Sequence, residues 1–97
     1  MAEFNETIHQ PVRLRIMAAL VTLEQADEVD FTYLRDLLEV TDGNLGAHLR
    51  KLEEDGYIAV NKIFVERKPR TFVAATAEGR KAFTEHVAAL ESILKSE

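Results

Sequence analysis

The sequence predicts a mainly α fold with one small β-hairpin, an α+β class, and three features of the chain support this prediction. The segment FTYLRDLLEV and the following TDGNLGAHLRKLEEDGYI have the pattern of two short helices joined by a tight turn. Two apolar runs then flank ERKPR, which is typical of a hairpin with a basic tip. The chain from Thr76 onwards has the apolar spacing of one long helix.

The first helix is expected to begin near His9 or Gln10, with Pro11 in its first turn, where its missing N–H is harmless. Its buried face is marked by apolar residues at helical spacing, namely Val12, Ile16, Leu20 and Leu23. The segment EQADEVD is expected to be a loop, and Val29 to Phe31 is compatible with a short strand.

The second and third helices form the expected helix-turn-helix, about residues 32–56. Thr32 is the expected N-cap of the second helix, whose core face would carry Leu34, Leu37 and Leu38. After a turn over residues 39–41, Thr41 is expected to cap the third helix, and Gly56 to end it.

The expected hairpin spans about residues 57–75, with strands from Tyr57 to Val65 and from Thr71 to Ala75. Pro69 is expected in the connection, because proline cannot donate a hydrogen bond within a sheet. Thr76 would cap the last helix, which runs over residues 77–95 and is roughly 28 Å long.

The third helix is expected to turn Leu45, Leu49 and Leu52 to the core, since they cluster on one side. Gly43, Gly46 and Ala47 leave the backbone of the free side bare, which allows close approach to a phosphate backbone or groove floor. Asn44 can pair with adenine, and Arg50 or Lys51 can reach guanine or phosphate. The alternative is a solvated helix face on which acidic neighbours pair with Arg50 and Lys51.

The net charge of the 97-residue chain is −5, but the charges are unevenly distributed. Residues 1–40 carry three basic and eight acidic side chains, whereas residues 41–71 carry six basic and five acidic ones. Around the hairpin, only Glu66 opposes Lys62, Arg67, Lys68 and Arg70. An acidic body with a basic edge can bind a polyanion in one orientation, with strong salt dependence. A basic hairpin tip that serves only solubility is the alternative.

Several function classes are not expected. The chain has no cysteine, which excludes disulfides and thiolate metal sites. No apolar run approaches the roughly 18 residues of a membrane span, and the N-terminal residues do not resemble a signal peptide. No set of residues suggests catalysis, a cofactor or a metal, so an enzyme is not expected. Three histidines are interpreted as ordinary surface or boundary residues, namely His9, His48 and His86.

Together, PVRLRIMAAL, VDFTYLRDLLEVTDGNLGAHLRKLEEDGYI, KIFVERKPRTF and TAEGRKAF resemble the winged helix-turn-helix DNA-binding proteins of bacteria and archaea related to MarR and ArsR transcriptional regulators. The resemblance covers roughly His9 to Leu94 and implies a cytoplasmic regulator of transcription that binds double-stranded DNA as a homodimer. It implies that the recognition helix, 42–55, contacts DNA with its cap and free side: Thr41, Asp42, Gly43, Asn44, Ala47, His48, Arg50 and Lys51. The wing would contact the DNA backbone through Arg67, Lys68 and Arg70, and the charge pattern adds Lys62.

Two departures from the resemblance are relevant. Gly46 stands where such proteins often place a serine, and the isoelectric point of about 5.2 is low for a DNA-binding protein. Metal-sensing ArsR-type relatives use a thiolate motif, or paired histidines and carboxylates on the last helix. On that helix this chain has one histidine, His86, with Glu85 adjacent to it and Glu91 off its face. Metal sensing is therefore not expected, and a small-molecule effector is left open.

The last helix has the pattern of a dimer interface, because Phe83, Val87, Leu90 and Leu94 follow one another at 4-3-4 spacing. Phe4 and Ile8 are expected to assist this contact. The alternative is that the stripe packs on the first helix of its own chain. A winged helix that serves as a protein-interaction module, without sequence-specific DNA binding, is the competing function.

Overall fold

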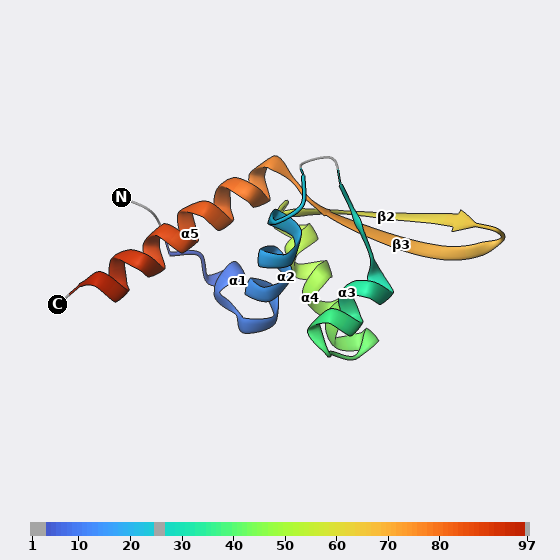
Figure 1. The fold of residues 1–97 in the computed structure, drawn as a ribbon, viewed down its shortest axis with the longest axis horizontal. Helices are drawn as coiled ribbons and strands as arrows, with labels where there is room; N and C mark the ends of the chain where they lie inside the picture. Colours follow the sequence, from blue (N-terminus) through green and yellow to red (C-terminus); the bar gives the residue numbers. More distant parts are fainter. Residues whose placement is uncertain (1–3, 25–26, 97) are drawn as a thin grey trace.

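The computed structural model describes residues 4–24 and 27–96. In this part of the chain, helices α1 (Glu6–His9) and α2 (Pro11–Val21) are followed by strand β1 (Val29–Asp30) and helix α3 (Phe31–Leu38). Then come α4 (Asp42–Glu54), β2 (Ile58–Val65), β3 (Lys68–Ala75) and α5 (Ala77–Lys95) (Figure 1). Residues 25–26 of the expected loop EQADEVD lie outside the described residues.

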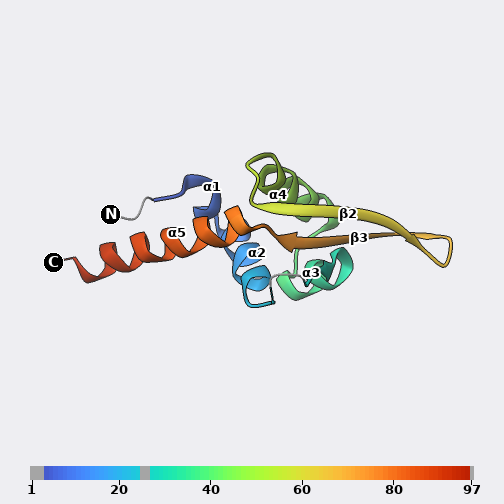
Figure 2. The same ribbon diagram turned by 90° about the horizontal axis from the view of Figure 1, so that it is seen from above.

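The molecule is elongated, with principal extents of 56 × 25 × 21 Å. Helices α2, α3 and α4 form a central body, from which the β2–β3 hairpin and helix α5 extend in opposite directions (Figures 1 and 2). Within the described ranges, no helix is both long and apolar enough to cross a membrane. The fold therefore places two extended arms at opposite ends of a small helical body.

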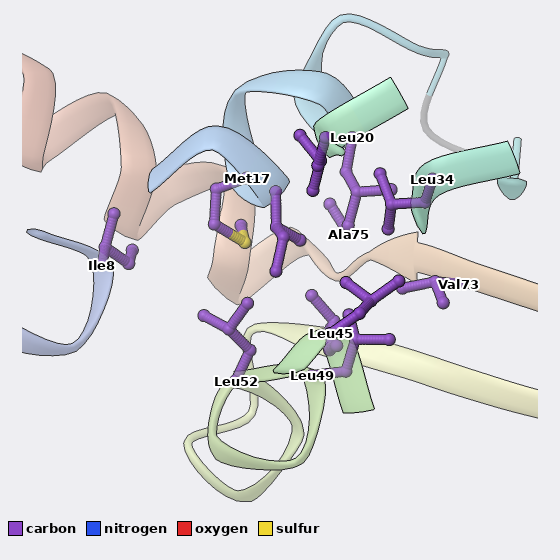
Figure 3. Packing of buried hydrophobic residues seen from close by; sticks show 12 residues of the cluster. Ile8, Met17, Leu20, Leu34, Leu45, Leu49, Leu52, Val73 and Ala75 are labelled. Carbon is purple, nitrogen blue, oxygen red and sulfur yellow. The ribbon is translucent and has the colours of Figure 1, made fainter. Parts of the chain in front are cut away.

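The core lies where the central helices meet the root of the hairpin (Figure 3). It is formed by side chains from the first four helices and from β2 and β3: Ile8, Ile16, Met17, Leu20, Leu34, Leu38, Leu45, Leu49, Leu52, Ile58, Val73 and Ala75. The expected leucine stripe of the third helix is confirmed, because Leu45, Leu49 and Leu52 are all buried. Truncating one such side chain to alanine costs about 2–5 kcal/mol, so this stripe fixes the orientation of α4.

The sheet has three antiparallel strands in the order β1-β3-β2, and β2 pairs with β3 along its whole length. Pro69 lies within β3, opposite Phe64, and not in the connection as the sequence suggested. The connection is only Glu66 and Arg67, whose φ angles of 51° and 68° are those of a two-residue type I′ turn. Along an antiparallel ladder, hydrogen-bonded residue pairs alternate with pairs that are not hydrogen-bonded, and Phe64 and Pro69 form a pair of the second kind. The main-chain nitrogen of residue 69 therefore points away from β2. Strand β1 reaches only Phe72, and proline therefore forfeits no hydrogen bond.

The ends of the helices are mostly set by the expected caps. The Thr41 hydroxyl accepts the Asn44 N–H at 3.1 Å, and the Thr76 hydroxyl accepts the Gly79 N–H at 2.9 Å. Gly56 follows α4 with φ of 81°, as expected of a glycine that ends a helix. Gln10 caps α2, whose first residue is Pro11, and the short helix α1 before it was not expected.

Two details of α3 differ from the sequence prediction. Its N-cap is Asp30, whose carboxylate accepts the Thr32 N–H at 2.7 Å, so Thr32 is inside the helix. Leu37 is 51% exposed, because Leu34 and Leu38 lie one turn apart on the buried side while Leu37 falls about 100° from Leu38.

Candidate nucleic-acid interface

The free side of α4 is open to solvent and carries most of the expected contact residues. Asp42, Gly43, Asn44, Ala47, Arg50 and Lys51 are exposed, and His48 is half-buried. Apart from the adjacent residues and the helix's own backbone, no atom lies within 4 Å of the position that a Cβ would take at Gly43 or Gly46. Packing within the chain therefore requires neither glycine, and the bare surface of the helix is available to a ligand.

The acidic side chain at the start of α4 is neutralised by a residue that sequence reasoning missed. Arg35 of α3 donates a hydrogen bond to Asp42 at 2.8 Å and forms an ion pair with Asp36 at 3.0 Å. These two carboxylates, Asp42 first, raise the pKa of Arg35. Arg35 thus offsets negative charge near the N-terminus of α4, where phosphate is favoured by the helix dipole.

A groove lies between the wing and α4, and both elements contribute a basic residue to it. Lys62 of β2 lies opposite Thr71 of β3, and both line a groove of about 270 Å³ between the wing and α4. Arg50 and Gly46 line the same groove from the helix. The structure therefore brings Lys62 and Arg50 to one side of the molecule, as a shared DNA-contacting surface requires.

Arg70 is held by its own chain. Its guanidinium forms an ion pair with Asp30, the N-cap of α3, and lies 5.5 Å from the centre of the Phe72 ring. The hydrogen bond from Arg70 is the largest cause that lowers the pKa of Asp30. Arg67 and Lys68, at the tip, are exposed. The four basic residues of the wing are thus not equivalent, and Arg70 ties the wing to α3.

The expected dimer residues divide into two groups. Phe83, Val87 and Leu90 are half-buried, and Leu94 is 82% exposed near the end of α5, where the helix has left the body (Figure 1). Phe4 is exposed as well. Ile8 was wrongly placed in this group: it is fully buried in the core of its own chain and offers no surface to a second subunit.

One of the three histidines is also not where the sequence suggested. His86 is fully buried, and its Nδ1 accepts the main-chain N–H of Asn5 at 2.9 Å. His9 packs beside it, and Phe4 contacts both rings. His86 could have been placed from its spacing, since it is in phase with the inward-facing Ala82 and Ala89 of the same helix. Among residues 4–24 and 27–96, no three His, Asp or Glu side chains are grouped so as to hold a metal ion.

A family model for the winged helix DNA-binding domain matches residues 12–94. The chain belongs to this family. In this winged-helix domain, α3 and α4 are the helix-turn-helix and the β2–β3 hairpin is the wing, which confirms the fold predicted from the sequence.

Comparisons with individual proteins agree with this assignment. An uncharacterized protein of Methanocaldococcus jannaschii is 40% identical over 76 residues, which cover 78% of this chain and 79% of the relative. The structure of a transcriptional regulator homologue from Pyrococcus horikoshii OT3 is similar, with a TM-score of 0.83 and 30% identity over 93% of this chain and 86% of that one. A putative MarR-family regulator from Enterococcus faecalis V583 matches with a TM-score of 0.71 and 26% identity, over 92% and 76% of the two chains.

Proposed function

We propose that this winged-helix protein regulates transcription in the cytoplasm by binding specific sites in double-stranded DNA as a homodimer. Helix α4 would enter the major groove, and the wing would lie along the adjacent backbone. The observation that carries the proposal is the shared groove: Arg50 of α4 and Lys62 of the wing line it together, beside the bare helix surface at Gly46. No cofactor is needed for these contacts.

Helix α4 and the wing would make different kinds of contact with DNA. Asn44 is exposed on the first turn of α4, where its amide can pair bidentately with adenine and so read sequence. Arg67 and Lys68 are exposed at the tip of the wing, where they can neutralise phosphates without reading bases. Affinity would then come largely from the wing and Arg50, and specificity from the first turns of α4.

Dimerisation is supported by the apolar end of α5. Leu94 is 82% exposed and Ile93 is 58% exposed, on a part of the helix that extends past the body (Figure 2). A second copy that packs on this surface through a two-fold axis would present two copies of α4 to one duplex. Recognition helices of such dimers read half-sites about 34 Å apart, one turn of DNA.

The negative net charge of the chain affects the orientation and the salt dependence of DNA binding. The chain has a net charge of −5, so duplex DNA is attracted to the α4 and wing side and repelled elsewhere. Binding is therefore expected to be orientation-specific and strongly dependent on salt.

A protein-interaction module is the second candidate, and the exposed face of α3 favours it. Tyr33 and Leu37 are both exposed there, near the acidic Asp36. The two candidates differ in their ligand, so a DNA-binding assay separates them.

The experiment is an electrophoretic mobility assay with duplex DNA from upstream of the protein's own gene, beside a scrambled duplex of equal length and composition. We expect a shifted band with the upstream duplex at a protein concentration at which the scrambled duplex stays free. Equal binding to both duplexes would contradict sequence specificity. No binding to either at low salt would favour the protein-interaction module.

A further inference from the structure

An aromatic side chain is exposed at the far end of the wing. Phe64 of β2 is 77% exposed, lies one residue before the end of its strand, and is absent from the hydrophobic core. Its strand neighbours Ile63 and Val65 are also exposed. Leaving a phenylalanine exposed forgoes most of the roughly 1.5–3 kcal/mol that its burial would contribute, so core packing does not explain this residue.

The alternation of side chains along β2 places Phe64 on the side of the sheet that faces α4. Ile58 and Val60 share this face, and Ile58 is buried in the core with Leu45 and Leu49 of α4. Lys62, next on the same face, lines the groove opposite Arg50. Phe64 is the outermost member of this row and lies opposite Pro69 of β3. Figure 1 shows the hairpin extending past α3 and α4 on one side of the body.

The overhang of the wing is a few ångströms shorter than half a turn of DNA. Phe64 lies four residues beyond Val60, the last β2 residue packed against the core, so it is about 13 Å farther out at 3.3 Å per residue. On B-DNA, half of one 34 Å turn is about 17 Å. A wing that starts beside a major groove occupied by α4 therefore brings Phe64 to the edge of the neighbouring minor groove.

The charges around Phe64 fit the same partner. Lys62 precedes it on the same face, and Arg67 and Lys68 follow it across the turn, all three exposed. Cations beside an apolar centre complement a minor groove, which has phosphates along both walls and sugar edges inside. Glu66 is the single acidic side chain in the connection.

We propose that the ring of Phe64, backed by Pro69, enters the minor groove next to the site of α4 and partly unstacks one base step there. This inference rests on the proposed function and adds a second reading element to it. Apolar side chains that enter the minor groove prefer steps that open easily, and the N2 amino group of guanine obstructs them. The wing would therefore favour a TA step over a GC-rich step at the flank of the site.

A fluorescent wing tip tests this directly, because the natural chain contains no tryptophan. In the variant Phe64→Trp, we expect the indole emission to fall by about half or more when duplex DNA is added, since a stacked indole is quenched by bases. The matched control is Ile63→Trp, one residue away on the opposite face of the hairpin, whose emission should change little.

The second arm measures affinity with inosine in place of guanine in the flanking DNA, which removes the minor-groove amino group and leaves the major groove almost unchanged. The unmodified chain should bind inosine-containing duplex more tightly, and Phe64→Ala should lose this preference along with about tenfold in affinity. Circular dichroism should show Phe64→Ala folded, since the ring packs against nothing in the core. If the emission of Phe64→Trp does not change on DNA that binds with normal affinity, the insertion of Phe64 into the minor groove is overturned and the proposed function is unaffected. Absence of duplex binding by the unmodified chain would overturn both.

Discussion

The buried ring of His86 accepts a hydrogen bond through Nδ1 from the main-chain N–H of Asn5, 2.9 Å away, and so anchors the N-terminal segment on α5. An accepting Nδ1 means that the proton of the neutral ring sits on Nε2, which lies 3.2 Å from Nδ1 of His9. Burial, and then the nearby His9, lower the pKa of His86 below its ordinary value of 6.5. Protonation of His86 would replace the acceptor at Nδ1 with a donor and break the bond to Asn5.

The first prediction concerns stability and pH. Because the pKa of His86 is lower in the folded chain than in the unfolded chain, the unfolded chain binds more protons below about pH 6.5, and acid favours unfolding. The pKa of His48 is lowered as well, chiefly by burial. The melting temperature should be level above pH 7 and fall as the pH drops from 6.5 to 5. In His86→Asn, whose side-chain oxygen can still accept from Asn5, this fall should be smaller, and an identical fall would contradict the assignment.

The second prediction concerns the crossing of α5 over the root of the wing. A Cβ at Gly79 would overlap the main-chain oxygen of Tyr57, and that oxygen also accepts the Thr76 N–H at 3.1 Å. Gly79→Ala should therefore destabilise the chain by about 2 kcal/mol or more in urea unfolding, because backbone would have to move. Gly46→Ala is the matched control, with open space at its Cβ position, and should stabilise by up to about 1 kcal/mol. Equal effects would contradict the close contact.

The third prediction concerns Arg70. Asp30→Asn keeps an acceptor for the Thr32 N–H, since asparagine is a good N-cap, but removes the charge that holds Arg70. Stability should fall by no more than about 1 kcal/mol, as is usual for a solvent-accessible ion pair. Affinity for duplex DNA should rise, and the salt slope should steepen by about 1 per subunit, because Arg70 becomes free to bind phosphate. Weaker binding by Asp30→Asn would instead show that Asp30 positions the wing productively.

The fourth prediction concerns the dimer. Leu94→Glu should dissociate it, because it places a charge in the proposed interface, and Leu94 is too exposed to stabilise its own chain. Leu90→Glu should do the same, although Leu90 is half-buried. In sedimentation equilibrium at micromolar concentration, the unmodified chain and the exposed-site control Ser92→Glu should both have twice the 11.0 kDa chain mass. A single 11.0 kDa species for the unmodified chain would rule out the dimer at that concentration.

The parts of the fold that local signals decide could be predicted from the sequence. The spacing of Leu45, Leu49 and Leu52 identified the buried side of α4, and Thr41, Gly56 and Thr76 marked helix ends because each acts on residues close by. Local sequence does not separate Asp30, the actual cap of α3, from Thr32, because both residue types cap helices well and lie two positions apart.

The remaining features depend on contacts between distant segments. Asp30 and Arg70 are 40 positions apart in the sequence, and Asn5 and His86 are 81 positions apart. The residues beside each of them in the sequence therefore do not indicate which residue it contacts. The extent of β3 was missed for a related reason. Proline is typical of a connection, and only the pairing geometry shows that position 69 of the strand needs no N–H donor.

The most direct test of the account compares Asn44→Ala with Arg67→Ala on specific and random duplex DNA over a range of salt concentrations. If a dimer neutralises about eight phosphates, the slope of log K against log salt should be near −7 for the unmodified chain. Arg67→Ala should flatten the slope by about 2 and weaken binding to both duplexes alike. Asn44→Ala should keep the slope and lose about 1–3 kcal/mol per half-site on the specific duplex alone. Equal losses of affinity by both variants on both duplexes would contradict the proposal that α4 recognises the base sequence and the wing binds the phosphate backbone.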